Sequence, residues 1–231
     1  MIVLVCLESP TPSLASRAAL RLACSLGEET EVVVLTVGSE TKGASIELAR
    51  PSAAVRRIIR LQDTAFSKAD FLTLGMILAE AARYLEARVV FAGEHSDSEG
   101  QGIVPAALAH HLRAPLFARV HSVHLPAAQN GKFENLEILQ MTVRSGGRLC
   151  KVTSPLPVVL TTSPSHTSDP QPLEVRNPAP ALEVLSLAQL GVDASRLVPR
   201  PDLLGTFAPA PAEIVQHKSF DEAARILLRR Q

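Results

Sequence analysis

The strongest constraint on the fold is an alternation of short β-branched runs with longer segments of helical periodicity. A run at 3–6 is followed by leucine and alanine at four-residue spacing between Leu14 and Leu26, and then by a second run at 32–37. These strands carry no polar alternation, so both of their faces must be buried. We therefore expect an α/β fold, with a mostly parallel sheet and helices on both faces.

The alternation continues as far as Pro115. Further strands are expected at 55–61 and 89–93, and the longest periodic segment, 67–86, predicts a helix between them. Proline is tolerated in the first turn of a helix because the amide it lacks has no partner there. Shorter helices are expected at 43–50 and from about Pro105 to Leu112.

After Pro115 the pattern changes to extended segments without intervening helices. The dipeptides Asn130-Gly131 and Gly146-Gly147 are strong hairpin signals, because their residues adopt the positive φ that tight turns require. We expect an antiparallel hairpin extension of the parallel sheet. Its strands would lie within 116–125, 133–143 and 148–152, with a last apolar strand at 157–162.

The distribution of proline suggests where the globular part ends. Of the 17 prolines, 11 lie from Pro155 onward. We expect residues 1–162 to form an α/β domain and residues 163–231 to form an extended, proline-rich C-terminal arm, which ends in a helix at 219–230.

Composition excludes several classes of function. Lys plus Arg and Asp plus Glu both number 23, and aromatic residues make up 3% of the chain, so neither nucleic acid nor a membrane surface is an expected partner. The opening residues lack the basic start and long apolar core of a secretory signal. Cys6, Cys24 and Cys150 are widely spaced, which favours reduced thiols and a cytoplasmic location.

The most informative segment for chemistry is the loop between the strand ending at Gly93 and the next helix. In an open α/β sheet, ligands bind beyond the carboxyl ends of the strands, and a helix N-terminus there attracts phosphate. Gly102 would allow a phosphate to approach the backbone, and a valine at this position is expected to block the site without unfolding the domain. The alternative is a well-capped loop without a ligand. The candidate residues are Gly93, Glu94, His95, Ser96, Asp97, Ser98, Glu99, Gly100, Gln101, Gly102 and Ile103.

Motifs for catalysis by the chain's own side chains are missing. The sequence contains no Gly-x-Ser-x-Gly elbow, no Walker A loop and no Rossmann glycine fingerprint. Cys6 is expected to be a small buried residue rather than a nucleophile. His121 and His124 would face opposite sides of a strand, so no metal site is expected. We therefore do not expect an enzyme.

One ordered series of segments along 1–162 is informative as a whole: the opening strand 2–7, Thr36-Val37-Gly38, 47–59, 78–93, the loop with Gln101, Gly146-Gly147 and 156–162, followed by 182–192. This series resembles the β subunit of electron transfer flavoproteins, including its nitrogen-fixation-associated relatives. The resemblance implies an adenine-nucleotide-binding fold, Rossmann-like and similar to that of universal-stress-type proteins.

The resemblance also implies a role and a set of contacts. The chain would be the small subunit of a heterodimer, with an α-like subunit that holds most of the FAD, and it would carry electrons between a dehydrogenase and the respiratory chain or another acceptor. The arm 163–231 would contact the α-like subunit. The chain's own site would hold AMP or a second FAD, or it would be empty. The residues of this site would be the loop 93–103 together with Cys6, Leu7, Val37 and Gly38.

Departures from the family pattern leave other functions open. The family's Pro-Arg-Tyr segment for docking partner dehydrogenases is replaced by 163–172, so docking to standard acyl-CoA dehydrogenases is not expected. The redox partner, whether a dehydrogenase or a quinone oxidoreductase, is not specified by the sequence. The alternatives are a flavin-free, universal-stress-type sensor of adenine nucleotides and a scaffold that has lost its ligand.

Overall fold

The computed structural model describes most of the first 194 residues, all of them within one compact unit, Met1–Arg200. The predicted turn at Asn130-Gly131 and the predicted helix at 219–230 lie outside the described residues, as does most of the segment 43–50. The described residues are 1–8, 11–27, 29–38, 46, 49, 54–64, 66, 69–95, 102–125, 138–163, 180–194 and 197.

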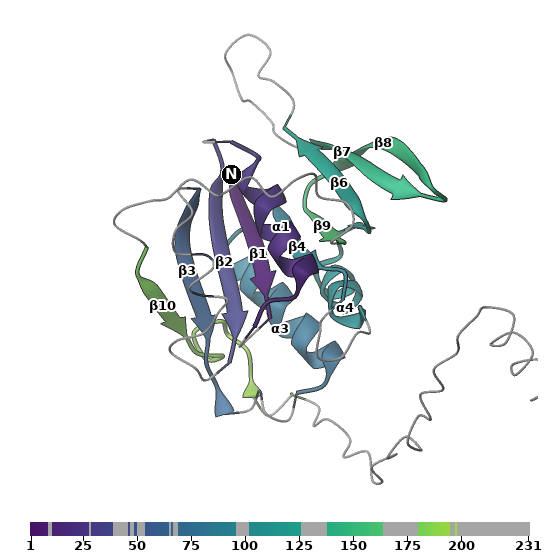
Figure 1. Ribbon diagram of the computed structural model, residues 1–231. Coiled ribbons are helices and arrows are strands. Elements are labelled where there is room, and N and C mark those ends of the chain that lie inside the picture. The colour runs from purple at the N-terminus through teal and green to yellow at the C-terminus, as the bar shows by residue number, and fades with distance from the viewer. Residues whose placement is uncertain are drawn as a thin grey trace, which may run out of the picture. The chain divides into compact units, whose positions relative to one another are not determined.

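The described strands form one large sheet and one small sheet (Figure 1). The strands of the large sheet are β1 (Ile2–Leu7), β2 (Glu31–Val37), β3 (Val55–Leu61), β4 (Val89–Gly93), β5 (Leu116–Phe117), β9 (Val158–Thr162) and β10 (Leu182–Leu185). Their order is β10-β3-β2-β1-β4-β9-β5, and every pairing between these described strands is parallel. The predicted α/β class with a mostly parallel sheet is therefore confirmed.

Three described helices cover the large sheet: α1 (Leu14–Cys24), α3 (Phe71–Tyr84) and α4 (Ile103–Leu112). Helix α1 begins where the sequence predicts, because the Ser13 side chain accepts a hydrogen bond from the amide of Ser16 at 3.1 Å. Helix α3 begins later than predicted, since Asp70 caps it by accepting from the amide of Thr73 at 2.7 Å.

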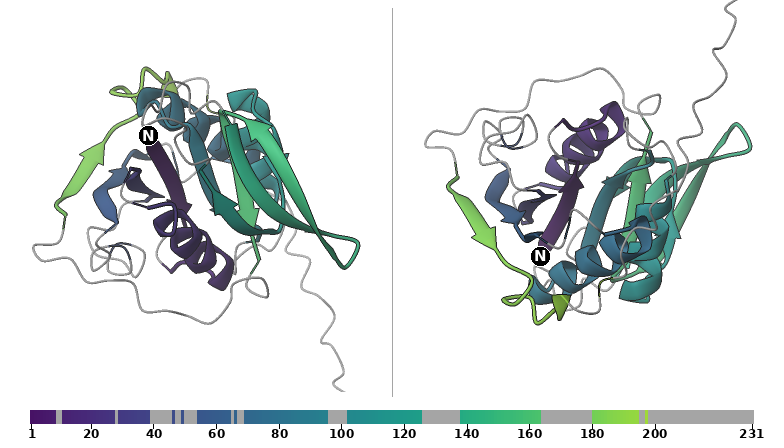
Figure 2. Two further views of the ribbon diagram at one scale, coloured as in Figure 1. Left: turned by 90° about the horizontal axis from the view of Figure 1, so that it is seen from above. Right: turned by 90° about the horizontal axis from the view of Figure 1, so that it is seen from below.

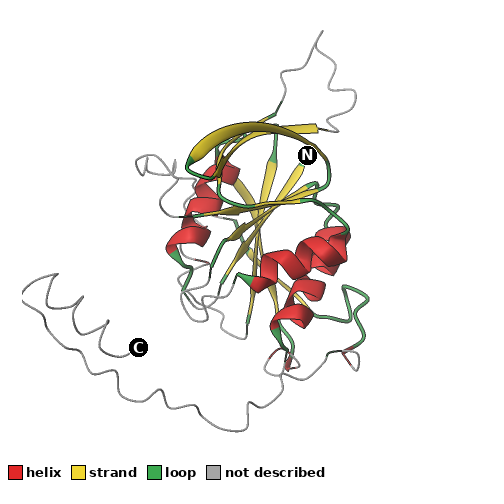
Figure 3. Ribbon diagram, turned by 90° about the vertical axis from the view of Figure 1, so that its right-hand side faces the viewer, coloured by secondary structure: helices red, strands yellow, loops and turns green. Residues whose placement is uncertain are grey.

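Alternate residues of each strand contribute to two apolar clusters, one on each face of the sheet. Val3 and Val5 pack on the α1 face, whereas Leu4 packs on the opposite face with residues of α3 and α4. All three side chains are fully buried. Figure 3 shows the resulting layers, with helices on both sides of the strands. The expectation that these strands are buried on both faces is confirmed.

The small sheet is an antiparallel extension, as predicted. It consists of β6 (Val120–His124), β7 (Ile138–Ser145) and β8 (Arg148–Pro155), and Gly146 and Gly147 turn the chain between the last two with φ of +55° and +78°. Val120 and Leu139 belong to the apolar cluster on the α1 face, so this sheet shares a core with the large one.

The sequence predicts a single extended segment at 116–125, but the structure divides it in two. Arg119 has φ of +58°, and the chain bends there between β5 and β6. Strand β5 pairs in parallel with β9 in the large sheet, whereas β6 pairs with β7 in the small one. A local bend of the backbone thus separates the two sheets.

Part of the predicted C-terminal arm is built into the large sheet. Strand β10 pairs in parallel with β3, and the amide of Gln62 donates to the carbonyl of Leu185 at 2.9 Å. Leu187 and Leu190 are buried in the cluster on the α3 and α4 face. Figure 2 shows β10 at one edge of the large sheet, with the small sheet towards the other. The division at 162/163 and the contact of the arm with a partner remain predictions.

Helices α3 and α4 pack closely at Gly75, and a substitution there tests this contact. A Cβ atom at Gly75 would overlap Ala107 and lie 2.8 Å from the backbone nitrogen of Leu108. We expect Gly75→Ala to reduce the free energy of unfolding by about 1 to 3 kcal/mol, because the helices must separate. Denaturant unfolding measures this change. Leu72→Ala on the exposed side of α3 is the control, and an equal loss of stability in both variants would contradict the proposed contact.

Candidate functional site

The order of the strands places a crevice at the centre of the large sheet. Strand β1 lies between β2 and β4, and the chain passes from β1 to β2 and β3 before it crosses back to β4. The helices that follow β1 and β4 lie on opposite faces of the sheet. Such a point, at the carboxyl ends of parallel strands, is where α/β proteins bind ligands.

A cavity of about 710 Å³ lies at this position. It extends from the ends of β1, β2 and β4 to the first turns of α3 and α4. The structure thus brings together predicted site residues from three separate parts of the sequence. Those that line the cavity are Cys6, Leu7, Val37, Gly38, Gly93, Glu94, His95, Gly102 and Ile103. The remaining ones, Ser96, Asp97, Ser98, Glu99, Gly100 and Gln101, lie outside the described residues.

An apolar wall of the cavity was not predicted as part of a site. Phe71, Leu74 and Leu78 follow the helical periodicity that the sequence assigns to a core stripe, and in the structure they also line the cavity. Phe66, just before α3, lies beside them. The periodicity identified the correct face of the helix, but it could not show that the amino-terminal part of this face meets a cavity.

The first turn of α4 provides an uncapped helix N-terminus at the cavity. Gly102 is the N-cap residue, with φ of +60° and no side-chain cap. Pro105 lies in the first turn, as predicted, and Ile103 and Val104 line the cavity with it. By contrast, α1 and α3 begin with a side-chain cap. The positive end of the α4 dipole therefore faces the cavity without a compensating protein group on Gly102.

The structure gives a second reason for glycine at 102, besides the predicted approach of a phosphate. A Cβ atom there would lie 2.7 Å from the carbonyl oxygen of Glu94, so the chain's own backbone also restricts this position. Valine at 102 is therefore expected to destabilise the fold, and its effect on a ligand remains a prediction. Its side chain would disturb the junction between β4 and α4 as well as any ligand site.

Alanine at position 102 tests this close approach. We expect Gly102→Ala to lower the free energy of unfolding by about 2 kcal/mol, through the positive φ and the contact with Glu94. Gly146→Ala is a matched control, because Gly146 has φ of +55° but open space around it. Denaturant unfolding of both variants separates the two contributions, and equal losses would show that the contact with Glu94 contributes nothing.

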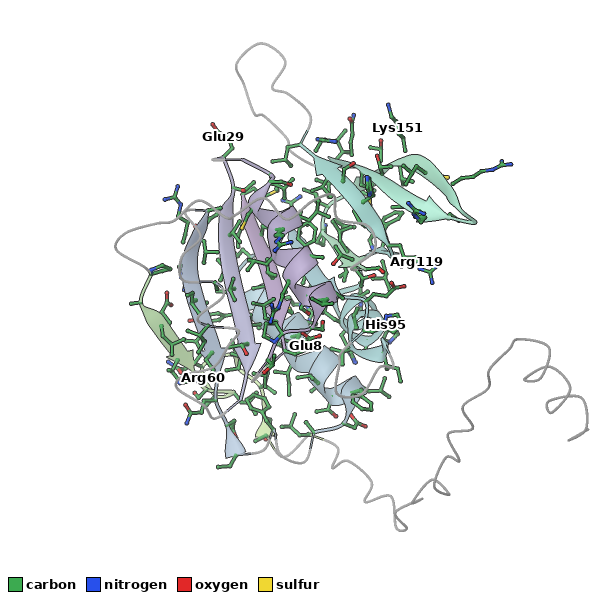
Figure 4. All side chains as sticks on the ribbon, in the orientation of Figure 1. Glu8, Glu29, Arg60, His95, Arg119 and Lys151 are labelled. Carbon is green, nitrogen blue, oxygen red and sulfur yellow. The ribbon has the colours of Figure 1, made fainter. Side chains whose placement is uncertain are left out.

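Charged side chains border the cavity and are held by other groups of the chain. Glu8 accepts hydrogen bonds from the backbone and the hydroxyl of Ser13, both at 3.2 Å. Glu94 accepts one from Nε of Arg119 at 3.0 Å, and Nδ1 of His95 lies 4.0 Å from its other oxygen. Figure 4 shows Glu8, His95 and Arg119 among the labelled side chains. The carboxylates of Glu8 and Glu94 are thus engaged within the protein.

Cys6 lies near the end of β1, where it is partly buried and lines the cavity. Burial, and secondarily the negative charge of Glu8, raises the pKa of the Cys6 thiol to about 12. Because only the thiolate is a good nucleophile, Cys6 is unreactive near neutral pH. The sequence predicts a small buried residue, and in the structure Cys6 is only partly buried because it lines the cavity. Although it lines the cavity, Cys6 offers shape and apolar surface rather than chemistry.

Alkylation compares the reactivity of the Cys6 and Cys150 thiols. At about pH 8, iodoacetamide should modify the exposed Cys150 and leave Cys6 unmodified, because its thiolate forms in quantity only as the pH approaches 12. Peptide mapping by mass spectrometry reads out both sites. Unfolding in denaturant should make Cys6 as reactive as Cys150. Equal rates in the folded protein would contradict the raised pKa of the Cys6 thiol.

Arg60 and Thr36 form a buried polar pair that the sequence analysis did not single out. They are neighbours in the register of β3 and β2, and Arg60 is 1% exposed. Nε and Nη1 of Arg60 and the hydroxyl of Thr36 have no hydrogen-bond partner among the described residues. An arginine in the run Ile58-Ile59-Arg60-Leu61 was the available signal. Arg60 lies on the α1 face, toward β10 and away from His95 and Arg119 (Figure 4), so it is not part of the cavity.

Comparison with known families identifies the fold that carries this cavity. Over residues 3–215, nearly the whole chain, the sequence matches the electron transfer flavoprotein domain. The chain belongs to this family. Members of the family are electron carriers and generally work with FAD. The matched range includes every residue that lines the cavity.

One further comparison and two features of the described residues bear on the chain. No match is found among curated proteins. Within the part of the chain that the structure describes, no helix is long and apolar enough to cross a membrane. The described His, Cys, Asp and Glu side chains form no group of three or more that could hold a metal ion.

Proposed function

We propose that this chain is the small, β-like subunit of a heterodimeric electron transfer flavoprotein, and that its cavity binds the adenylate part of a nucleotide such as AMP. The observation that carries the proposal is the cavity at the carboxyl ends of β1, β2 and β4, which faces the uncapped N-terminus of α4. The family match favours the role of electron carrier over that of a universal-stress-type sensor.

The residues of the cavity suit an adenine nucleotide. A volume of about 710 Å³ falls within the usual range for small-molecule sites. The apolar side chains of Phe66 and Leu74 offer a surface for the adenine ring, and the amides of Ile103 and Val104 in the first turn of α4 would donate to a phosphate. Cys6, Leu7, Val37 and Gly38 would contact the nucleotide from the ends of β1 and β2.

The chain's own contribution to electron transfer would be structural. When bound, FAD supplies the electron-carrying chemistry, and most of its contacts would come from the α-like subunit. This chain would help to enclose the flavin and exclude water. Cys6, the thiol at the cavity, stays protonated and would take no part in chemistry. We do not expect the chain to be an enzyme.

The proposal also covers the partners of the chain and its location in the cell. Segment 163–231 would contact the α-like subunit, apart from the stretch that pairs as β10 with β3. The electron donor and acceptor would be a dehydrogenase and the respiratory chain or another acceptor such as a quinone oxidoreductase. The zero formal charge supports neither nucleic acid nor an anionic membrane as partner, and the cytoplasm is the proposed location.

Affinity purification of the tagged chain from its native cells tests the partner and the flavin. We expect a second subunit and a yellow flavin absorbance to accompany it. Repeated isolation of a colourless chain that assembles only with itself would contradict the subunit role.

Titration calorimetry tests the nucleotide site separately. We expect the full-length chain to bind one AMP per chain, and to prefer AMP to ATP because the acidic residues at the rim disfavour additional negative charge. A cytosine mononucleotide is the control for adenine recognition. Tight ATP binding by a flavin-free homodimer would favour the sensor instead.

A further inference from the structure

The side chain of Glu94 lies at the cavity, next to the proposed phosphate site at the first turn of α4. Glu94 directly follows β4, and its amide donates to the carbonyl of Thr162 at 3.0 Å, which fixes its backbone. Its side chain is 16% exposed and lines the cavity. Its carbonyl oxygen packs against Gly102, the N-cap residue of α4. Glu94 and the helix N-terminus are therefore direct neighbours.

A carboxylate in this position opposes the binding of an anion. The amides and the dipole of α4 attract a phosphate, whereas an uncompensated negative charge next to them repels it. In a partly buried cavity this repulsion is weakly screened by salt. A phosphate-bearing ligand therefore requires a positive group that offsets Glu94.

Arg119 is in position to supply this charge. Its Nε donates to Glu94 at 3.0 Å, although the two residues lie 25 positions apart in the sequence. His95 lies farther from the same carboxylate, at 4.0 Å. Arg119 also has φ of +58°, which is unfavourable for a residue with a side chain. Its carbonyl accepts from the amide of Arg144 at 3.1 Å, so the small sheet holds it in this conformation.

We propose that Arg119 is a positioning residue that sets the ligand specificity of the cavity. By holding and neutralising Glu94, it allows a nucleoside monophosphate to bind in preference to the uncharged nucleoside. Arg119 acts through Glu94 rather than by contact with the adenine part. The inference rests on the proposed nucleotide site, and it assigns the preference for a phosphate to a residue outside the lining of the cavity.

A neutral substitution tests the inference with two ligands that differ only in the phosphate. Asparagine tolerates positive φ, so Arg119→Asn removes the charge and keeps the local backbone. In titration calorimetry of the full-length chain, we expect AMP to bind about tenfold more weakly to this variant than to the wild type. Adenosine should bind within about twofold of its wild-type affinity, since it carries no charge for Glu94 to repel.

Two further variants separate charge compensation from a merely structural effect. Arg113→Asn is the matched control, because Arg113 also has positive φ, at +55°, but caps the far end of α4. It changes the net charge equally and should leave both affinities unchanged. The double variant Glu94→Gln, Arg119→Asn should recover AMP affinity to within about threefold of the wild type, because the repelling carboxylate is gone.

The outcomes distinguish this inference from the proposed function. Wild-type protein that binds neither AMP nor adenosine would overturn the nucleotide site, and the role of Arg119 with it. AMP binding by the wild type that is unchanged in Arg119→Asn would overturn the role of Arg119 alone. Arg119 would be only structural if Arg119→Asn lost equal affinity for AMP and for adenosine. The same conclusion would follow if the double variant did not recover AMP affinity although its thermal unfolding matched that of the wild type.

Discussion

The pairing of β1 with both β2 and β4 is the interaction on which the rest of the site depends. Cys6 lies opposite Leu35 on one side and Ala92 on the other, so three strands end at nearly the same level. The helices after β1 and β4 then leave toward opposite faces, and the backbone cannot fill the crevice between them. Cavity, helix N-terminus and bordering carboxylates all follow from this arrangement.

The charge at the border of the cavity depends on individual hydrogen bonds and ion pairs rather than on the net charge of the chain. The chain is formally neutral, yet Glu8, Asp63 and Glu94 line the cavity. Glu8 is bound at the start of α1 by Ser13, and Glu94 is bound by Arg119. The amino terminus of α4 and the ion pair between Glu94 and Arg119 thus lie on the same side of the cavity, at the end of β4. These contacts connect the cavity with α1 and with the small sheet.

Two features were not predicted by the pattern of neighbouring residues: the pairing of β10 in the large sheet and the backbone conformation at Arg119. The sequence assigns 182–185 to an extended arm, since the prolines around it interrupt any periodicity, and only the partner strand β3 shows that this stretch completes the sheet. The sequence also predicts one extended segment at 116–125, and the bend at Arg119 depends on the small sheet, whose Arg144 amide donates to the Arg119 carbonyl. Both features arise from contacts between residues far apart in the chain, which a pattern of neighbours does not encode.

The sequence by itself determined the α/β class, the start of α1 at Ser13 and the turn at Gly146-Gly147, and it predicted a candidate site at the end of β4. These follow from short-range physics: strand burial, helix capping and the backbone freedom of glycine. Only the tertiary structure decided that Phe71 and Leu74 form a cavity wall, that Gly102 is fixed by Glu94, and that Arg119 neutralises this carboxylate. Each of these depends on distances between separate elements, which packing alone sets.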